Sequence, residues 1–203
     1  AVTAAGGLVG EVIQVWRPRE LNTHETEWGF SCMSYEISGA LGIKMANPDK
    51  EVISFVGDGS YLLNNTDIYS SVITNNKLII IVCDNGGFAV INRLQLFKGG
   101  NEYNNLLKSS NTPGLVNVDF AKHAESMGAK SEHVNSISDL EEAFKRAKKS
   151  DVTYVISIKT HAYQWLEGSA FWDSPTLEIP TTKENKEALK LYKEGKNKQR
   201  QGV

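Results

Sequence analysis

The sequence predicts an α/β fold of three layers, in which a mainly parallel sheet lies between two layers of helices. Three apolar segments, residues 51–56, 77–84 and 152–159, are rich in isoleucine and valine and have the length of buried strands. Segments with a helical spacing of apolar residues separate these strands along the chain. Strands that alternate with helices of about 10 to 15 residues are typical of a parallel sheet that is covered on both faces.

The helices are expected from the spacing of their apolar residues and from residues that end helices. "SYEISGALGIKMAN" predicts a helix over residues 34–47, which the following Pro48 ends. A second helix is expected to begin at Ser60 and to run through "NNTDIYSSVITN", residues 64–75. Two further amphipathic helices are expected at residues 118–129 and 137–150.

The composition favours one globular domain in a reducing compartment. With 22 Lys and Arg against 24 Asp and Glu, the chain of 203 residues lacks the positive charge of a nucleic-acid-binding protein. Cys32 and Cys83 lie far apart and have no metal-type neighbours, which favours free thiols in a cytoplasmic protein. The longest apolar run, Leu78 to Cys83, is much shorter than the roughly 20 residues of a membrane-spanning helix. We therefore expect neither a nucleic acid nor a membrane as a partner.

The start of the chain suggests a piece of a longer polypeptide. The first residues carry neither an initiator methionine nor a basic leader, so a fragment is expected. Residues 1–178 are predicted to form one domain. Residues 179–203 are predominantly basic and predict a solvated helix with a frayed tail, or alternatively an arm that binds phosphate or a partner.

Two polar loops follow neighbouring strands of the predicted sheet. "GDGS", residues 57–60, follows the first strand, and "DNGG", residues 84–87, follows the second, so that Asn85 lies 27 positions after Asp58. Because consecutive strands of a parallel sheet end at the same edge, we expect Asp58 and Asn85 to lie over one crevice. Carboxylate and amide oxygens suit Mg²⁺, and phosphates and water complete its coordination. The pair therefore predicts a site for Mg²⁺ and a diphosphate.

Glycines and the start of a helix would complete such a site. Gly57 and Gly59 permit a tight turn and a close approach of the backbone to a phosphate, and Ser60 would begin a helix whose N–H groups face the anion. Each loop alone is more often an ordinary turn, and only the pair in its strand-helix-strand context favours the diphosphate site. "GDGSYL" lacks the third glycine of a dinucleotide fingerprint, and the sequence has no Walker A loop.

These loops resemble the cofactor signature of the thiamine-diphosphate-dependent enzymes. The resemblance extends from residue 1 to about residue 175 and implies the diphosphate-binding domain of such an enzyme, with the pyrimidine-binding and central domains outside this chain. It implies that Asp58, the side chain of Asn85 and the carbonyl of Gly87 hold Mg²⁺. The cofactor-binding residues expected in all are Gly6, Gly7, Ser31, Met33, Gly57, Asp58, Gly59, Ser60, Asn85, Gly87 and Phe88.

The segments upstream of the metal loop are also similar to this family. The resemblance implies that Met33 lies between the two rings of the cofactor and keeps it bent, and that the carbonyl of Ser31 accepts a hydrogen bond from the aminopyrimidine. "TAAGGLVGEVIQVW" resembles the family's first strand and diphosphate-proximal loop, which brings Gly6 and Gly7 into the site. Asp84 stands where the family has the first asparagine of the pair, but the second position carries the metal ligand. Ser34 and Trp28 stand where glycine and tyrosine are expected in the most similar members, and neither departure concerns the cofactor.

Within this family, the chain is most similar to members that open a trihydroxylated cyclohexane-1,2-dione in inositol catabolism. The segments that carry this similarity are "HETEWGFSCMSYEISGALG", "DNGGFAVINRLQ" and "EGSAFWDSP". The similarity implies hydrolysis of a carbon–carbon bond to give 5-deoxyglucuronate. The family's cofactor-activating glutamate lies in the pyrimidine-binding domain, so no catalytic residue is assigned here and the isolated chain is expected to be inactive. A homodimer or homotetramer is expected, because the family binds its cofactor between subunits.

Three alternatives remain open for the function. The same cofactor could serve an acetolactate-synthase-like enzyme or a 2-oxo-acid decarboxylase. The chain could instead be a non-catalytic nucleotide- or phosphate-binding module, or an interaction domain whose sites have decayed.

Several residues outside the signature are weaker candidates. His24 and Glu27 could reach a substrate and Asn92 could line the pocket, with surface or packing roles as the alternatives. His123 and His133 are expected to be structural. An aromatic segment could cover the site or pack in the core or an interface; it contains His161, Trp165, Phe171 and Trp172.

Overall fold

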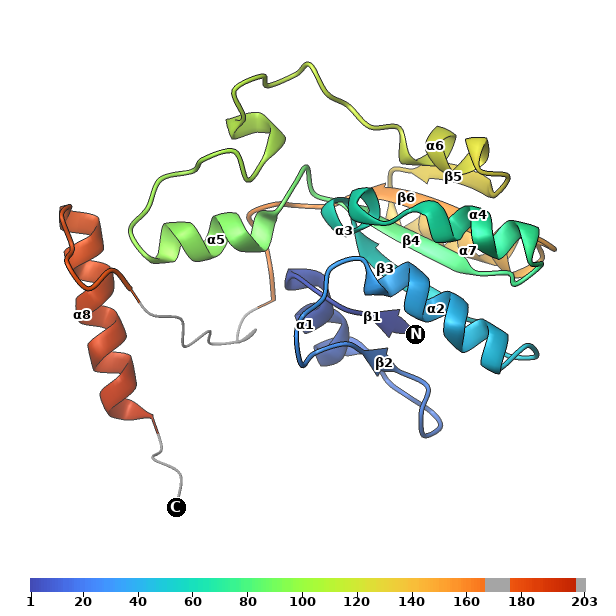
Figure 1. Cartoon of the computed structure of the whole chain (residues 1–203), viewed down its shortest axis with the longest axis horizontal. Coiled ribbons are helices and arrows are strands. Elements are labelled where there is room, and N and C mark those ends of the chain that lie inside the picture. The colour runs from blue at the N-terminus through green and yellow to red at the C-terminus, as the bar shows by residue number, and fades with distance from the viewer. Residues whose placement is uncertain (167–175, 200–203) are drawn as a thin grey trace.

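Six strands form one sheet in the computed structural model, which describes residues 1–166 and 176–199 (Figure 1). The strands are β1 (Val2–Thr3), β2 (Glu25–Thr26), β3 (Ile53–Gly57), β4 (Ile79–Asp84), β5 (Lys130–Val134) and β6 (Tyr154–Lys159). They lie in the order β2-β1-β3-β4-β6-β5, and every neighbouring pair is parallel. The predicted α/β fold with a parallel sheet is therefore confirmed.

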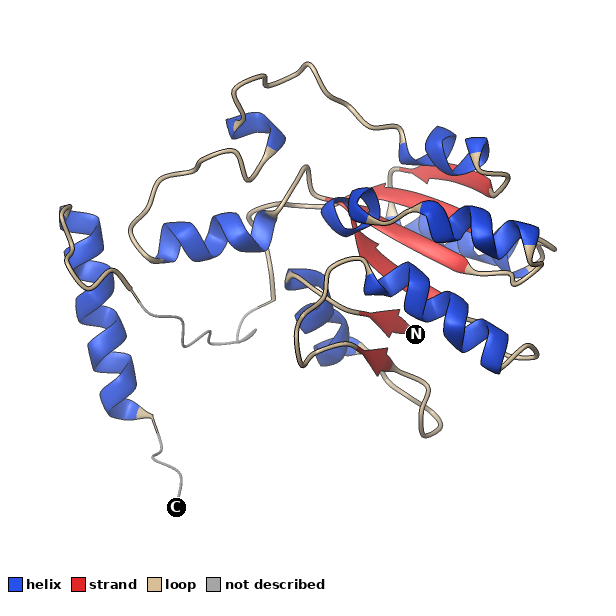
Figure 2. Cartoon of the chain, viewed as in Figure 1, coloured by secondary structure: helices blue, strands red, loops and turns tan. Residues whose placement is uncertain are grey.

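Helices cover both faces of this sheet (Figure 2). They are α1 (Gly7–Val15), α2 (Tyr35–Ala46), α3 (Asp58–Leu63), α4 (Thr66–Ile73), α5 (Ala89–Phe97), α6 (Phe120–Ser126), α7 (Ile137–Lys148) and α8 (Lys183–Lys198), with a 3-10 turn at Leu107–Ser109. Buried side chains of α2, α4 and α6 form the core on one face, and those of α7 form the core on the other. The three layers follow from this division.

The central strand β4 contributes to both cores. Ile80 and Val82 are buried in the core with α2, α4 and α6, whereas Ile79 and Ile81 are buried in the core with α7. Successive residues of a strand point to opposite faces, so a strand that is covered on both sides carries apolar residues at every position. This geometry explains the uninterrupted run "LIIIVC".

One predicted helix is two helices in the structure. We expected a continuous helix from Ser60 to residue 75, but α3 already begins at Asp58, and the helical path breaks at Asn64 and Asn65. Asn65 Nδ2 donates to the carbonyl of Tyr61 at 3.2 Å. Side-chain hydrogen bonds of this local kind compete with those of the helix, which explains the break.

Several elements of the structure were not predicted. β2 has two residues and β5 is an edge strand of mostly polar residues, so neither has an apolar run. β1 also has only two residues, and the resemblance alone implied a strand there. α1 and α5 both follow glycine-rich loops, which concealed their helical spacing. The segment that resembled a first strand and loop is thus a short strand followed by a helix of nine residues.

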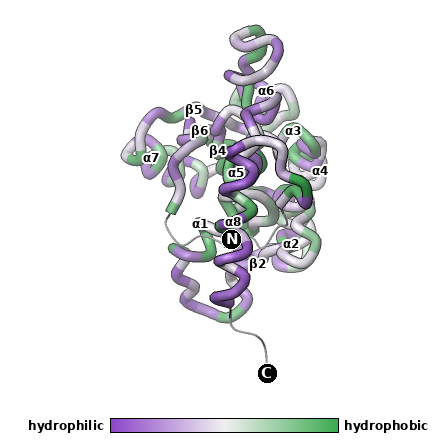
Figure 3. Tube along the Cα trace, turned by 90° about the vertical axis from the view of Figure 1, so that its left-hand side faces the viewer, coloured by the Kyte–Doolittle hydropathy of each residue, from purple (hydrophilic) through white to green (hydrophobic). Residues whose placement is uncertain are grey.

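α8 lies apart from the sheet, beside the end of α5 (Figure 1). Asn185 Nδ2 connects the two helices, since it donates to the carbonyls of Lys98 and Gly99 at 3.0 and 2.9 Å. The helix is mostly hydrophilic along its length (Figure 3). Among the described residues, no helix combines the length and the apolar character that crossing a bilayer requires.

Candidate functional site

Two loops meet at the edge of the sheet where β3 and β4 end. The strands are neighbours, with Gly57 paired to Cys83, so the residues that follow them emerge side by side. Asp58 is the first residue of α3, and Asn85 follows β4 directly. Backbone N–H groups of Asn85 and Gly87 lie near enough to the Asp58 carboxylate to lower its pKa. The structure therefore brings the two expected metal ligands together.

A cavity of about 270 Å³ opens over these loops. Its walls come from the β1-α1 loop, the segment before α2, the start of α3 and the β4-α5 loop. Every residue that the sequence singled out for the cofactor lines it: Gly6, Gly7, Ser31, Met33, Gly57, Asp58, Gly59, Ser60, Asn85, Gly87 and Phe88. The fold thus gathers into one cavity residues that lie far apart along the chain.

Asp58 is a buried carboxylate with only 5% of its surface exposed. Burial and the nearby carboxylate of Asp84 raise its pKa to about 6, although N–H groups of Gly87, Gly59 and Asn85 act in the opposite direction. Both the burial and the like charge disfavour the ionised carboxylate. A cation beside Asp58 would offset both effects.

The side chain of Asn85 supplies the clearest sign of a ligand-binding site. Its Oδ1 is buried and has no hydrogen-bond partner among the described residues. A buried polar atom without a partner costs about 1 to 3 kcal/mol, so such atoms in folded proteins call for an explanation. Because Mg²⁺ takes carboxylate, amide and carbonyl oxygens, the donor set of Asp58, Asn85 and Gly87 fits this ion.

Two glycines shape the floor of the cavity. Gly87 has a φ of 142°, and a Cβ atom there would lie 2.3 Å from the carbonyl oxygen of Asn105. A Cβ atom on Gly59 would lie 2.6 Å from the ring of Phe88. We expected the turn to need glycine at residue 57 as well. Gly57, however, has an ordinary φ of −75°, and an added Cβ would meet no atom within 4 Å, so the turn does not require glycine there.

Glu27 holds the loop that carries Ser31 and Met33 to the cavity. Its Oε1 accepts the N–H of Phe30 at 2.9 Å, and its Oε2 accepts the N–H of Cys32 at 2.5 Å. These bonds lower the pKa of Glu27 and bracket Ser31, whose φ of 51° is left-handed. The carboxylate thus turns into its own loop, and Glu27 does not line the cavity.

A buried carboxyl group lies behind the cavity wall. Glu36 is 1% exposed, and its Oε1 accepts the N–H of Ala5 at 3.4 Å. Burial raises the pKa of Glu36 despite hydrogen bonds that include one with Ser60. The Oγ atom of Ser60 also accepts the N–H of Ser34 at 3.1 Å. This hydrogen bond holds the backbone at residue 34, where serine replaces the expected glycine. Ser34 has a left-handed φ of 75°.

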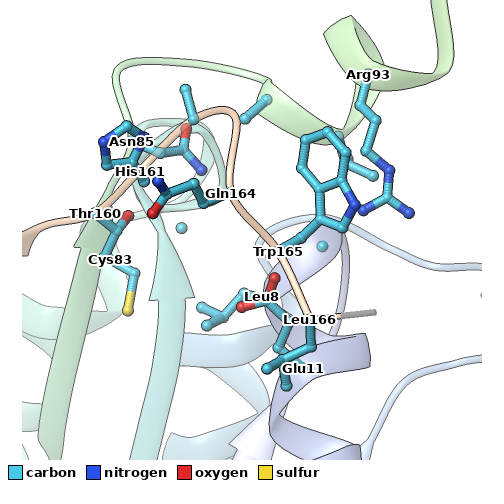
Figure 4. Close-up of a pocket in the computed structure, with 15 residues that line it drawn as sticks. Leu8, Glu11, Cys83, Asn85, Arg93, Thr160, His161, Gln164, Trp165 and Leu166 are labelled. Carbon is cyan, nitrogen blue, oxygen red and sulfur yellow. The ribbon is translucent and has the colours of Figure 1, made fainter. Parts of the chain in front are cut away.

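A second cavity of about 440 Å³ adjoins the first (Figure 4). The two share six lining residues: Gly7, Leu8, Gly57, Asn85, Ala89 and Val90. The remaining wall comes from α1, α5 and the segment after β6, and it contains Glu11, Arg93, His161, Gln164 and Trp165. Together the cavities form a continuous pair at the carboxyl edge of the sheet.

The family of the chain is decided by its sequence match. Residues 4–158 match the thiamine pyrophosphate enzyme family, in its C-terminal TPP binding domain. The chain belongs to this family. The resemblance read from the two loops is therefore confirmed.

The relatives of this thiamine pyrophosphate enzyme domain agree with the narrower resemblance. The 3D-(3,5/4)-trihydroxycyclohexane-1,2-dione hydrolase of Bacillus licheniformis is 37% identical over 193 residues, which cover 95% of this chain and 30% of the relative. The Bacillus subtilis hydrolase of that name is 38% identical over 171 residues, which cover 84% of this chain and 27% of the relative. The chain thus spans about 30% of the length of these relatives.

A solved structure shows the same fold. The thiamine diphosphate-dependent 4-hydroxybenzoylformate decarboxylase of Rhodococcus jostii RHA1 matches 79% of this chain and 34% of its own, with a TM-score of 0.62. Its sequence identity of 20% supports the shared fold alone.

The thiamine pyrophosphate enzyme domain accommodates its unusual Asp84 through a lysine. Asp84 is buried, accepts the N–H of Gly86 at 3.0 Å and forms an ion pair with Lys159 on β6. Lys159 lies opposite Asp84 in the register of β4 and β6. Lys159 therefore gives this carboxylate, which replaces the usual asparagine, a counter-ion, although Asp84 still raises the pKa of Asp58.

The weaker candidates divide between the second cavity and structural roles. His161 and Trp165 line the second cavity, whereas Phe171 and Trp172 lie outside the described residues. Asn92 is buried and donates to Glu102 at 3.1 Å. His24, His123 and His133 line neither cavity, and each ring lies within 3.2 Å of a hydroxyl: Thr3 and Thr26, Tyr61, and Ser157 respectively.

The sequence analysis missed Glu11 and Arg93. Both lie on helices, α1 and α5, that were not predicted. A helical reading of residues 89–97 would have placed Arg93 one turn after Ala89, on the side that faces the second cavity. No signal in the sequence pairs Arg93 with Glu11, because only the folded sheet brings α1 and α5 together.

Proposed function

We propose that the chain is the diphosphate-binding part of a thiamine-diphosphate-dependent hydrolase. Its substrate would be 3D-(3,5/4)-trihydroxycyclohexane-1,2-dione, and hydrolysis of a carbon–carbon bond would give 5-deoxyglucuronate. The names of the relatives and their identity of 37 to 38% support this substrate. The observation that carries the proposal is the buried Oδ1 of Asn85, which has no hydrogen-bond partner among the described residues and belongs to a residue that lines the same cavity as Asp58.

Each wall of the first cavity has a role in this proposal. Asp58, the side chain of Asn85 and the carbonyl of Gly87 would hold Mg²⁺. Gly59 and Ser60 would contact the diphosphate from the start of α3, and Phe88 from the start of α5 would border it. Gly6 and Gly7 would bound the diphosphate from the β1-α1 loop.

The segment before α2 would orient the ring end of the cofactor. Met33 would support the bent form of the cofactor, and the carbonyl of Ser31 would accept a hydrogen bond from it. The hydrogen bonds of Glu27 to the neighbouring N–H groups of Phe30 and Cys32 would hold Ser31 in place. When bound, thiamine diphosphate supplies the carbanion that adds to a ketone, which is chemistry that no side chain provides. The chain contributes binding, orientation and charge.

The rest of the enzyme would complete the site. In this proposal residues 1–178 are the diphosphate-binding domain, and residues 179–203 are an appended helix and tail. The activating glutamate belongs to the pyrimidine-binding domain, so the isolated chain is inactive. Exposed apolar side chains near the cavity support burial against another domain or subunit in a homodimer or homotetramer: Phe30, Phe88 and Ile91.

Turnover by the full-length enzyme tests this function. With Mg²⁺ and thiamine diphosphate, we expect the trihydroxylated dione to be consumed with formation of 5-deoxyglucuronate, and pyruvate to be left unchanged. Removal of Mg²⁺ with a chelator should abolish turnover, and its return should restore it. Decarboxylation or condensation of pyruvate without dione hydrolysis would instead assign the chain to a decarboxylase or an acetolactate-synthase-like enzyme.

A further inference from the structure

The second cavity has a volume typical of a ligand site and a position beside the expected cofactor. Its volume of about 440 Å³ lies within the range of about 300 to 1,000 Å³ of small-molecule pockets. Because six residues line both cavities, a molecule in the second cavity would lie next to one in the first. None of the expected roles of the cofactor-binding residues uses the far wall of this cavity.

The far wall brings together groups of opposite charge from different parts of the chain. Figure 4 shows Glu11 and Arg93 on either side of Trp165, with His161 and Gln164 across the cavity. Glu11 comes from α1, Arg93 from α5, and the other three from the segment after β6. The guanidinium of Arg93 lies 4.4 Å from the centroid of the Trp165 ring, which fixes its plane at the wall.

The two charged groups are partly withdrawn from water. Burial raises the pKa of Glu11, while an N–H of Leu166 and the charge of Arg93 act in the opposite direction. Burial lowers the pKa of Arg93, against the charge of Glu11. Both side chains are intermediate in exposure, so they offer an acceptor and a donor that water solvates incompletely.

This combination selects one class of ligand over two others. A purely apolar molecule would take water from both charged groups and offer them no hydrogen bonds. An anion would suit Arg93 but would meet the carboxylate of Glu11. A neutral molecule with several hydroxyl groups satisfies both, because each hydroxyl donates to a carboxylate and accepts from a guanidinium. The amide of Gln164 can serve in either sense.

We propose that the second cavity binds the hydroxyl-bearing ring of the substrate and that Glu11 and Arg93 recognise its hydroxyl groups. This inference rests on the proposed function for the identity of the substrate. It adds two specificity-determining residues, one on α1 and one on α5. The recognition itself concerns any compact, neutral polyol.

The first test compares two substrates of the full-length enzyme loaded with Mg²⁺ and thiamine diphosphate. Glu11→Gln and Arg93→Lys should raise KM for the trihydroxylated dione by about tenfold, because the first removes the charge of the acceptor and the second removes the planar, forked donor of the guanidinium. KM for unsubstituted cyclohexane-1,2-dione should change less than about threefold. Glu141→Gln on the exposed face of α7 is the matched control, and it should leave both values unchanged.

The second test measures binding without turnover. Calorimetry with myo-inositol, a neutral polyol, should show binding to the loaded wild-type enzyme that weakens at least about tenfold in Glu11→Gln and Arg93→Lys. Affinity for thiamine diphosphate should stay the same in both variants, which also shows that they fold. Wild-type enzyme that hydrolyses no dione would overturn the proposed function, yet the polyol measurement would still test this inference.

Three outcomes would overturn the inference. The loaded wild-type enzyme could fail to bind the polyol. The variants could bind it as the wild type does. They could also lose thiamine diphosphate affinity in step with polyol affinity, which would place Glu11 and Arg93 in the cofactor site.

Discussion

At the level of single residues, the side chain of Asn85 is expected to lower the stability of the ligand-free protein and to favour binding of a ligand. Asn85 keeps a buried oxygen without a partner among the described residues, which is unfavourable in the absence of a ligand. We therefore expect Asn85→Leu to raise the thermal midpoint of the cofactor-free enzyme, or leave it unchanged, by removing this oxygen at similar volume. The same change should abolish Mg²⁺-dependent cofactor binding, measured by calorimetry. Asn85→Asp, which keeps an oxygen ligand, is the control and should retain that dependence.

Two results together would contradict the role of Asn85 as a metal ligand. A variant Asn85→Leu that melts several degrees lower and still binds cofactor in a Mg²⁺-dependent manner would show that the amide serves packing only. In that case the Oδ1 of Asn85 would make a hydrogen bond that stabilises the folded protein.

The buried carboxyl of Glu36 makes stability depend on pH. Its pKa is raised by burial above the value of 4.5 expected in the unfolded chain. The folded state therefore binds the proton more tightly, and stability is greatest below pH 4.5 and falls as the pH rises through the folded pKa. Glu36→Gln should remove this fall, so its thermal midpoint relative to wild type should increase between pH 4.5 and pH 8. Glu141→Gln should show no such trend, and a pH-independent difference for Glu36→Gln would refute the assignment.

Sequence reasoning found the residues of the first cavity, and His161 and Trp165 of the second, but it did not find Glu11 and Arg93. Asp58 and Asn85 could be found because a polar residue directly after an apolar strand has a fixed place at the sheet edge. Glu11 and Arg93 lie in mid-helix, where charged residues are common and carry no positional signal. Their role depends on the meeting of α1, α5 and the segment after β6, which is a tertiary feature.

At the scale of elements, the loop between β4 and α5 depends on one glycine. A Cβ atom at Gly87 would meet the carbonyl of Asn105 at 2.3 Å, in a backbone conformation that other residues rarely adopt. Gly87→Ala should therefore destabilise the loop by about 1 to 3 kcal/mol or more. We expect a lower thermal midpoint together with weaker cofactor binding.

Gly114 provides the matched control for this loop. It also has a left-handed φ, of 83°, but its added Cβ would meet no atom within 4 Å. Gly114→Ala should thus report the backbone strain alone. Equal effects of the two substitutions on the thermal midpoint would contradict the steric role assigned to Asn105.

The helices and strands differ in how well they can be predicted from the sequence. β3, β4 and β6 are buried on both faces, so their apolar runs identified them. The edge strand β5 is mostly polar, and β1 and β2 form only two ladder residues each, so pairing with neighbours defines them. The break between α3 and α4 was missed because it depends on side-chain hydrogen bonds of Asn64 and Asn65, which helical spacing does not reveal.

At the level of the whole molecule, the proposed function makes this chain one part of a larger site. Both cavities lie at one edge of the sheet, and exposed apolar side chains line the first of them, among them Phe88 at 40% and Ile91 at 48% exposure. The chain spans about 30% of the length of its relatives, so the proposal assigns the missing half to other domains and subunits. The cavity that a cofactor would occupy is therefore expected to close only in the assembled enzyme.

In the proposed function, Asp58 and Asn85 coordinate one divalent cation, and this cation binds the diphosphate of the cofactor. Calorimetric titration of the full-length enzyme with thiamine diphosphate, with and without Mg²⁺, tests it most directly. We predict binding that requires Mg²⁺ and that weakens at least about 100-fold in Asp58→Asn, while Asp151→Asn, at an exposed position, binds as the wild type does. Equal affinity with and without Mg²⁺, or an unchanged affinity in Asp58→Asn, would contradict the account.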